Sequence, residues 1–122
     1  FYQAPALAVD TKVTDTINRE EVFGPVMSVI RASDYADALA KANASTMNLS
    51  SGIVTRDLAE AHHFKRHSKA GMVMVNVPTA GVDFHVPFGG RGQSSYGPRE
   101  QGPAAVEFFT SSKTAYTAPG KP

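Results

Sequence analysis

Apolar residues are grouped along the chain in four short runs that predict β-strands. The first is a small patch at residues 6–9, and the second, residues 26–30, is nearly continuous in apolarity and rich in β-branched side chains. A run of that kind is typical of a strand covered on both faces. Residues 52–55 predict a third strand, and residues 72–77, the most hydrophobic run of the chain, predict a central strand.

Two amphipathic helices are predicted between the last three of these strands. Ser33 or Asp34 caps the first, whose apolar residues recur at the spacing of one helix face. These residues are Tyr35, Ala38, Leu39 and Ala42. Asp57 caps the second helix, which we expect to run to about Lys69 and to be followed by Gly71 as a left-handed C-cap. Its inward side chains are predicted to be Leu58, Ala61 and Phe64.

The alternation of strands and helices predicts two successive βαβ units. Because such crossovers are right-handed and join parallel strands, we expect an α/β fold with a parallel sheet and flanking helices. Residues 78–102 are rich in glycine and proline with apolar side chains between them, which predicts a long loop that builds a binding surface. Residues 103–109 predict a short helix, and residues 110–118 alternate like an exposed strand that needs a partner sheet.

The composition is that of ordinary globular material. The 122 residues are 42% hydrophobic and 19% charged, enough for one compact unit with a single core. The net charge of +1 and the lack of an apolar run of about 20 residues argue against nucleic-acid and membrane partners, so we expect a soluble, cytoplasmic protein. There is no cysteine for a disulfide, a thiolate metal site or a nucleophile. The chain starts at Phe1 and not at Met, which suggests processing or a piece of something longer.

Three motifs suggest chemistry, but each is incomplete. Gly-Gly-Arg-Gly at residues 89–92 lacks the spacing of a phosphate-binding loop, and we interpret its glycines as allowing two backbone segments to approach closely. His63 and His67 stand four residues apart on a predicted helix, a geometry that can bind zinc, but no third ligand is evident and we interpret them as surface histidines. A hydrolase triad of His85 with one of the serines at 94–95 lacks the nucleophile elbow.

The segment Glu-Glu-Val-Phe-Gly-Pro at residues 20–25 predicts a fixed bend before the second strand. Pro25 fixes its own φ and biases Gly24 away from helix, and adjacent carboxylates are poor strand formers. Such a bend can aim a side chain toward a ligand. On local grounds alone the alternative is a plain acidic turn in contact with solvent.

Several blocks, taken together and in this order, resemble the aldehyde dehydrogenase family. They are residues 20–25, Ala-Gly-Met-Val-Met-Val-Asn at 70–76, Pro-Phe-Gly-Gly at 87–90, Ser-Ser-Tyr-Gly at 94–97 and Arg-Glu at 99–100. The resemblance covers nearly the whole chain and is to the C-terminal part of that enzyme. By it, residues 1–109 are the latter part of the catalytic domain and residues 110–122 are the terminal oligomerisation strand and tail. The ketoglutarate-semialdehyde branch is the most similar.

The resemblance implies roles for five residues. Glu21 would accept hydrogen bonds from the nicotinamide ribose of NAD or NADP, since a carboxylate offers two acceptor oxygens to a diol. Phe23 would pack near the nicotinamide ring. Phe88, with Val82 and His85 in the loop before it, would line the aldehyde pocket. The family's nucleophilic cysteine and general-base glutamate lie upstream of the matched part, so the isolated chain is predicted to be an inactive piece of this oxidoreductase.

The resemblance also implies partners and leaves one alternative open. The partners are the rest of the enzyme, an aldehyde substrate and further copies bound through the terminal strand. Asn76 is expected to fix its loop and not to contact substrate, and Arg91 stands near the position where the family often has a lysine. The alternative is a non-catalytic α/β module that self-associates through residues 110–118.

Overall fold

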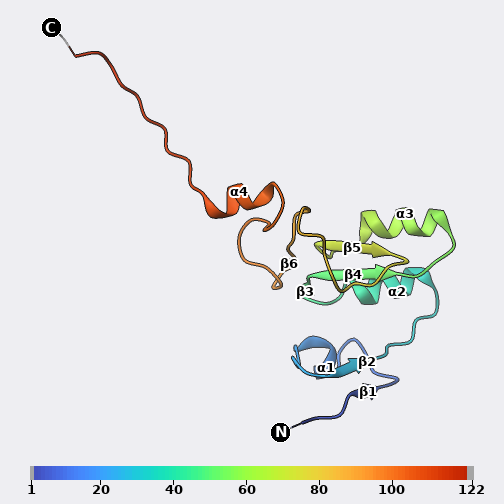
Figure 1. Cartoon of the computed structure of the whole chain (residues 1–122). Helices are drawn as coiled ribbons and strands as arrows, with labels where there is room; N and C mark the ends of the chain where they lie inside the picture. Colours follow the sequence, from blue (N-terminus) through green and yellow to red (C-terminus); the bar gives the residue numbers. More distant parts are fainter. Residues whose placement is uncertain (1, 121–122) are drawn as a thin grey trace.

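A computed structural model describes residues 2–120, whose strands form three separate two-stranded sheets (Figure 1). The strands are β1 (Ala6–Ala8), β2 (Val26–Ser28), β3 (Met47–Asn48), β4 (Ser50–Ile53), β5 (Met72–Val75) and β6 (Arg91–Gly92). The helices are α1 (Thr16–Arg19), α2 (Tyr35–Ala42), α3 (Leu58–His67) and α4 (Ala104–Phe109). Pairs β1–β2 and β4–β5 are parallel, which confirms the α/β class, and β3–β6 is antiparallel. The topology differs from the expected single sheet, because β2 pairs with β1 and not with β4.

The N-terminal strand pair is held together by a helix that the sequence did not predict. The polar residues 10–19 were expected to form a surface connection, but they contain α1. Asn18 on this helix is hydrogen-bonded to the segment after β1 and to β2. The Asn18 amide donates to Thr11 Oγ1 at 3.0 Å and to the Lys12 carbonyl at 2.8 Å, and its oxygen accepts from the Ser28 hydroxyl on β2. The expectation that β2 is covered on both faces is wrong, since Met27 is 63% exposed.

Helix α2 begins where capping chemistry predicted. Asp34 is the N-cap, and its side chain accepts from the backbone N–H of Asp37 at 2.8 Å. The predicted apolar stripe is only partly covered. Its half-buried members are Tyr35 and Leu39, and its exposed members are Ala38 and Ala42. The exposed alanines show that α2 has an apolar face larger than the rest of the chain covers.

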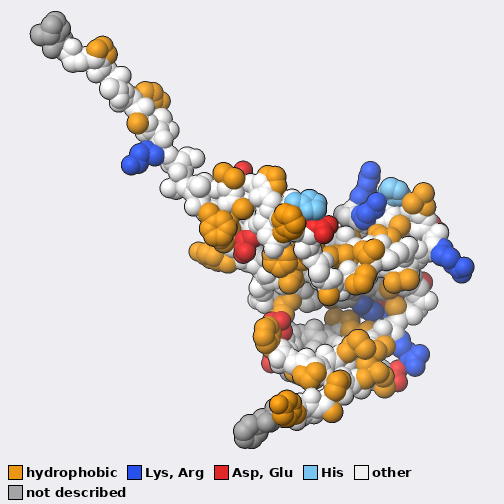
Figure 2. All heavy atoms as spheres, in the orientation of Figure 1, with side chains coloured by type: hydrophobic (Ala, Val, Ile, Leu, Met, Phe, Trp, Pro, Cys, Tyr) orange, Lys and Arg blue, Asp and Glu red, His pale blue; other side chains and the backbone are white. Residues whose placement is uncertain are grey.

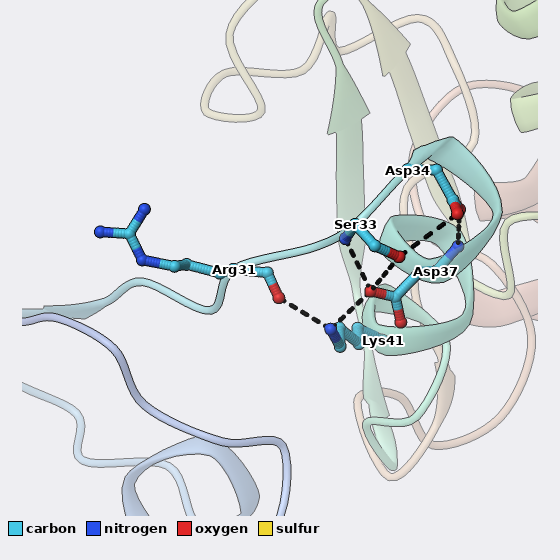
Figure 3. Close-up of polar contacts among 5 residues, drawn as sticks. All are labelled: Arg31, Ser33, Asp34, Asp37 and Lys41. Carbon is cyan, nitrogen blue, oxygen red and sulfur yellow. Dashed lines mark hydrogen bonds and ion pairs between the residues drawn. The ribbon is translucent and has the colours of Figure 1, made fainter.

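Lys41 joins α2 to the segment that follows β2 (Figure 3). Its ammonium group donates to the Asp37 carboxylate at 2.6 Å and to the Arg31 carbonyl at 2.7 Å. The same carboxylate accepts from the Ser33 backbone N–H at 2.9 Å. The hydrogen bond from Lys41, and after it the one from Ser33, favour the charged carboxylate and hold the pKa of Asp37 below its ordinary value of 3.8.

The Asp37 contacts are expected to weaken in acid. A carboxyl group whose pKa is lowered by folding stabilises the folded state above the unfolded pKa, and this contribution is lost as the pH falls through the lowered value. A carboxyl NMR titration should give Asp37 a midpoint below 3.8, and Lys41→Met should raise that midpoint. The same midpoint in both proteins would contradict the ion pair.

The small core lies where α3 packs against β5. Asp57 caps α3 as predicted, by accepting from two backbone N–H groups, and the helix ends at His67, two residues before the expected end. The buried side chains are Ala61, Phe64, Ser68 and Ala70. Leu58, predicted to face inward, is 71% exposed. Gly71 is not the predicted left-handed C-cap, because that end of α3 is closed by Ser68 in an extended conformation.

The expectation of one compact unit is wrong for the isolated chain. A compact monomer of 13.0 kDa exposes about 6,300 Å², whereas this chain exposes 9964 Å². Figure 2 shows apolar side chains on the visible surface around α4 and over the N-terminal strand pair. The exposed large side chains in these two regions include Leu7, Met27, Phe84, Val106 and Phe109. The fold therefore presents apolar surface that a further protein surface could cover.

The C-terminal part begins with α4, which confirms the short predicted helix, and continues as an extended segment that leaves the body of the molecule (Figure 1). Within the described part of the chain, residues 110–120 pair with no strand. The terminal strand therefore stays a prediction. No helix within residues 2–120 is both long and apolar enough to cross a membrane.

Candidate functional site

The bend before β2 is fixed at both of its ends. The Glu20 backbone N–H donates to the Thr16 carbonyl at 2.8 Å and so closes α1. At the other end the Pro25 carbonyl accepts from Ala6 of β1 at 2.9 Å. Glu21 and Phe23 lie between these anchors, where neither side chain is covered. The bend is a rigid support that holds a free carboxylate and a free aromatic ring.

Phe23 has a strained backbone. Its φ of 52° lies in the left-handed region, which is rare for a bulky side chain and costs about 1–3 kcal/mol. Its ring is nevertheless 92% exposed, so packing within this chain does not offset the strain. A cavity of about 290 Å³ lies beside it, lined by residues of the segment 17–28 that include Glu21, Phe23 and Ser28. Strain of this kind gathers at ligand sites, which favours a binding role for the bend.

The loop before β6 holds the three residues assigned to the aldehyde pocket. Phe88 is half-buried and forms an antiparallel bridge with Glu100, with N···O distances of 2.6 and 2.9 Å. Val82 is half-buried. His85 is exposed, and its ring lies edge-on to Phe84 at 5.6 Å. The bridge fixes Phe88 more firmly than the other two.

Gly89 and Gly90 confirm the interpretation of the glycine-rich motif as a place of close backbone approach. Both are buried, and the Gly90 N–H donates to Ser95 Oγ. Ser95 thus has a structural partner in the loop, which gives no support to the hydrolase triad. A Cβ atom placed on Gly71 would lie 2.2 Å from the Gly89 carbonyl oxygen and 2.7 Å from Gly90 Cα. The start of β5 therefore fits against this loop only because residue 71 has no side chain.

Gly71→Ala is expected to destabilise the chain by about 1–3 kcal/mol, because the backbone atoms in the way must move apart. Gly24→Ala is the matched control, since its Cβ would meet no atom closer than 4.0 Å. Denaturant unfolding of both variants measures the difference. Equal loss of stability in the two would contradict the close packing.

Asn76 precedes this loop and Arg99 lies within it. Asn76 has a φ of 58°, and its side chain donates to the Thr55 carbonyl and accepts from the Thr55 N–H, both at 2.9 Å. It joins the ends of β4 and β5, and its expected role in fixing the following loop stays a prediction. Arg99 has a buried Nη1 atom that finds no hydrogen-bond partner in the described chain. Sequence reasoning missed this burial because it depends on the folding of the loop over β5.

The cofactor residues of the bend and the aldehyde residues of the loop do not share one cavity in this chain. The cavity at Glu21 and Phe23 is lined by residues of the 17–28 segment and does not reach Val82, His85 or Phe88. Among residues 2–120, no group of three or more His, Cys, Asp and Glu side chains could hold a metal ion. The arrangement offers hydrogen-bond acceptors and aromatic surface, but no complete catalytic centre.

The chain is similar to known proteins over nearly its whole length. The model of the aldehyde dehydrogenase family matches residues 1–115. An α-ketoglutarate semialdehyde dehydrogenase of Haloferax volcanii is 46% identical over 92% of the chain and 23% of that protein. A betaine aldehyde dehydrogenase of Brucella melitensis is 42% identical over 99% of the chain and 24% of that protein.

A solved structure agrees with these sequence matches. The Mycobacterium tuberculosis aldehyde dehydrogenase complexed with NAD+ superposes with a TM-score of 0.78 and 32% identity, over 92% of this chain and 24% of the other. The chain spans about a quarter of the length of the curated relatives it matches. By both the family match and the shared fold, this chain belongs to the aldehyde dehydrogenase family.

Proposed function

We propose that this chain is the C-terminal part of an NAD(P)-dependent aldehyde dehydrogenase, which oxidises an aldehyde to a carboxylic acid. The observation that supports this proposal best is the strained bend, which holds Glu21 and Phe23 exposed beside a cavity. The relatives' names give the activity, and a structural neighbour with the same fold is a complex with NAD+.

The bend fits one end of a dinucleotide. The cavity of about 290 Å³ is slightly smaller than the usual range for ligand pockets, so it suits the nicotinamide ribose and not the whole cofactor. The Glu21 carboxylate is free to accept two hydrogen bonds from a ribose diol. The exposed Phe23 ring would restrict the position of the nicotinamide. The cofactor, when bound, supplies the hydride acceptor.

The aldehyde would be held by the loop before β6. Phe88, anchored by its bridge to Glu100, offers an aromatic wall, and Val82 and His85 complete that side. The two relatives named above act by name on α-ketoglutarate semialdehyde and betaine aldehyde. We therefore propose a small polar aldehyde as substrate, with a semialdehyde as the first candidate.

The isolated chain is proposed to be inactive. It contains no cysteine, so a thiol that attacks the aldehyde must come from outside these residues. The test joins the chain to the first three quarters of the Haloferax volcanii relative, in place of that protein's matching quarter. We expect NAD(P)H formation with a semialdehyde from the joined protein and none from the chain alone. Turnover by the isolated chain, or a folded joined protein without turnover, would contradict the proposal.

Self-association of the isolated chain is expected both for the dehydrogenase and for the alternative, a non-catalytic module, so turnover by the joined protein is what distinguishes them. The exposed area of 9964 Å² and the unpaired extended segment 110–120 favour association of the isolated chain. Sedimentation velocity should show dimers or larger species that disappear when residues 110–122 are removed. A monomer at high concentration would contradict association through this segment, and an active joined protein would exclude the purely non-catalytic reading.

A further inference from the structure

The outer face of α3 brings two imidazole rings together. His63 and His67 stack with ring centroids 3.9 Å apart and an angle of 15° between their planes. Both side chains are exposed, and neither has a part in the proposed dehydrogenase site. A spacing of four residues places both rings on one face of the helix. The question is which of their ring nitrogens have free lone pairs.

The hydrogen bonds of His67 answer this for one ring. Its Nδ1 atom lies 2.8 Å from the carbonyl oxygen of His63. A carbonyl oxygen only accepts, so Nδ1 of His67 must bear the proton and donate it. In a neutral imidazole the other nitrogen then has a free lone pair. His67 therefore presents Nε2 as a metal-binding atom.

Tyr35 on α2 occupies the corresponding nitrogen of His63. The Tyr35 hydroxyl lies 3.4 Å from the Glu60 carbonyl oxygen, to which it can only donate, and 2.8 Å from Nδ1 of His63. The 2.8 Å contact is the stronger of the two, so Nδ1 of His63 is occupied by the Tyr35 hydroxyl. Nε2 is thus the ring nitrogen of His63 left for a metal ion, in the tautomer whose Nδ1 proton is donated to the Tyr35 oxygen.

We propose that His63 and His67 form a two-nitrogen site for a divalent transition-metal ion, such as Cu²⁺, Ni²⁺ or Zn²⁺. The ion is bound by the two Nε2 atoms, and water completes its coordination. A metal-binding histidine usually donates its other ring N–H to an outer partner such as a backbone carbonyl, which is the arrangement at His67. The rings have to tilt toward each other from their stacked position, which their exposure allows. The positive side chains of Lys65 and Arg66 on the same helix limit the affinity.

The test is a calorimetric titration of the 122-residue chain with each metal chloride. We expect one ion per chain, with Cu²⁺ binding more tightly than Ni²⁺ or Zn²⁺, and no binding of Mg²⁺, which prefers oxygen ligands. His63→Gln and His67→Gln should each weaken Cu²⁺ binding at least tenfold. Tyr35→Phe removes the outer partner of His63 and should weaken it about tenfold. His62→Gln is the matched control, since that residue lies about 100° away around the helix, and it should leave binding unchanged.

The unfolded chain provides a second control. In concentrated urea the same four histidines are present but α3 is lost, so the affinity for Cu²⁺ should fall at least tenfold. Equal binding by folded and unfolded chains would overturn the site. So would a His62→Gln effect as large as that of His63→Gln, or the absence of saturable Cu²⁺ binding to the folded chain.

Discussion

Glu21→Gln is expected to slow hydride transfer about ten- to a hundredfold in the joined enzyme described above. The substitution keeps the shape of the side chain but removes its charge and one acceptor oxygen. Hydrogen bonds to a charged group contribute about 1.5–3 kcal/mol, which corresponds to that range of rates. Single-turnover measurements of NAD(P)H formation report this step directly. Because Glu21 is exposed and has no structural partner to lose, the fold should be unaffected.

Glu20→Gln is the matched control for this prediction. The two carboxylates are adjacent and both exposed, but only Glu21 is assigned to the ribose. The Glu20 backbone N–H closes α1, a contact that the substitution preserves. The control should therefore transfer hydride at the original rate. Equal rates for the original protein and Glu21→Gln would remove Glu21 from the site, and a larger effect at Glu20 would exchange the two roles.

Phe64→Ala is expected to destabilise the chain by about 3–5 kcal/mol, which is the cost of removing a buried phenyl ring. Phe64 is 4% exposed and is the largest side chain in the core between α3 and β5. A domain has only about 5–15 kcal/mol of stability, and this chain has few other buried side chains. We therefore expect Phe64→Ala to leave α3 and β5 largely unfolded, seen as collapsed dispersion of their amide NMR signals.

Leu58→Ala on the same helix is the control for this experiment. Leu58 is 71% exposed, so its truncation should change the free energy of unfolding by no more than about 0.5 kcal/mol. If the two substitutions had the same effect, the core would not be centred on Phe64. The comparison also tests which face of α3 is buried, because sequence periodicity placed both side chains on the inner face.

Local chemistry was predictable from the sequence, and burial was not. The caps of α2 and α3 depend on side chains next to the helix: Asp57 was identified correctly, and Asp34 was one of two candidates with Ser33. Met27 and Leu58 were predicted to be buried because apolar spacing shows which face of an element is apolar. It does not show whether another part of the chain packs against that face. Within residues 2–120 the fold leaves both side chains exposed. Helix α1 was missed because its four residues are too few to show a period.

The candidate site shows the same division. Glu21, Phe23 and Phe88 were selected through a family resemblance, since their local sequence favoured an ordinary turn and loop. The left-handed backbone of Phe23 has no sequence signal, because glycine and asparagine are the residues that normally adopt it. Similarly, the hydrogen-bond partner of the His63 ring is Tyr35 from another helix, which no spacing rule within α3 includes.

The strained backbone at Phe23 has a consequence for the directed evolution of this family. Gly or Asn at this position would relieve a strain of about 1–3 kcal/mol, so a screen for heat resistance alone should enrich these residues. A screen for turnover should retain the aromatic ring. The two screens would thus select different residues at position 23. Variants selected for heat resistance would need Phe restored there before their turnover is measured.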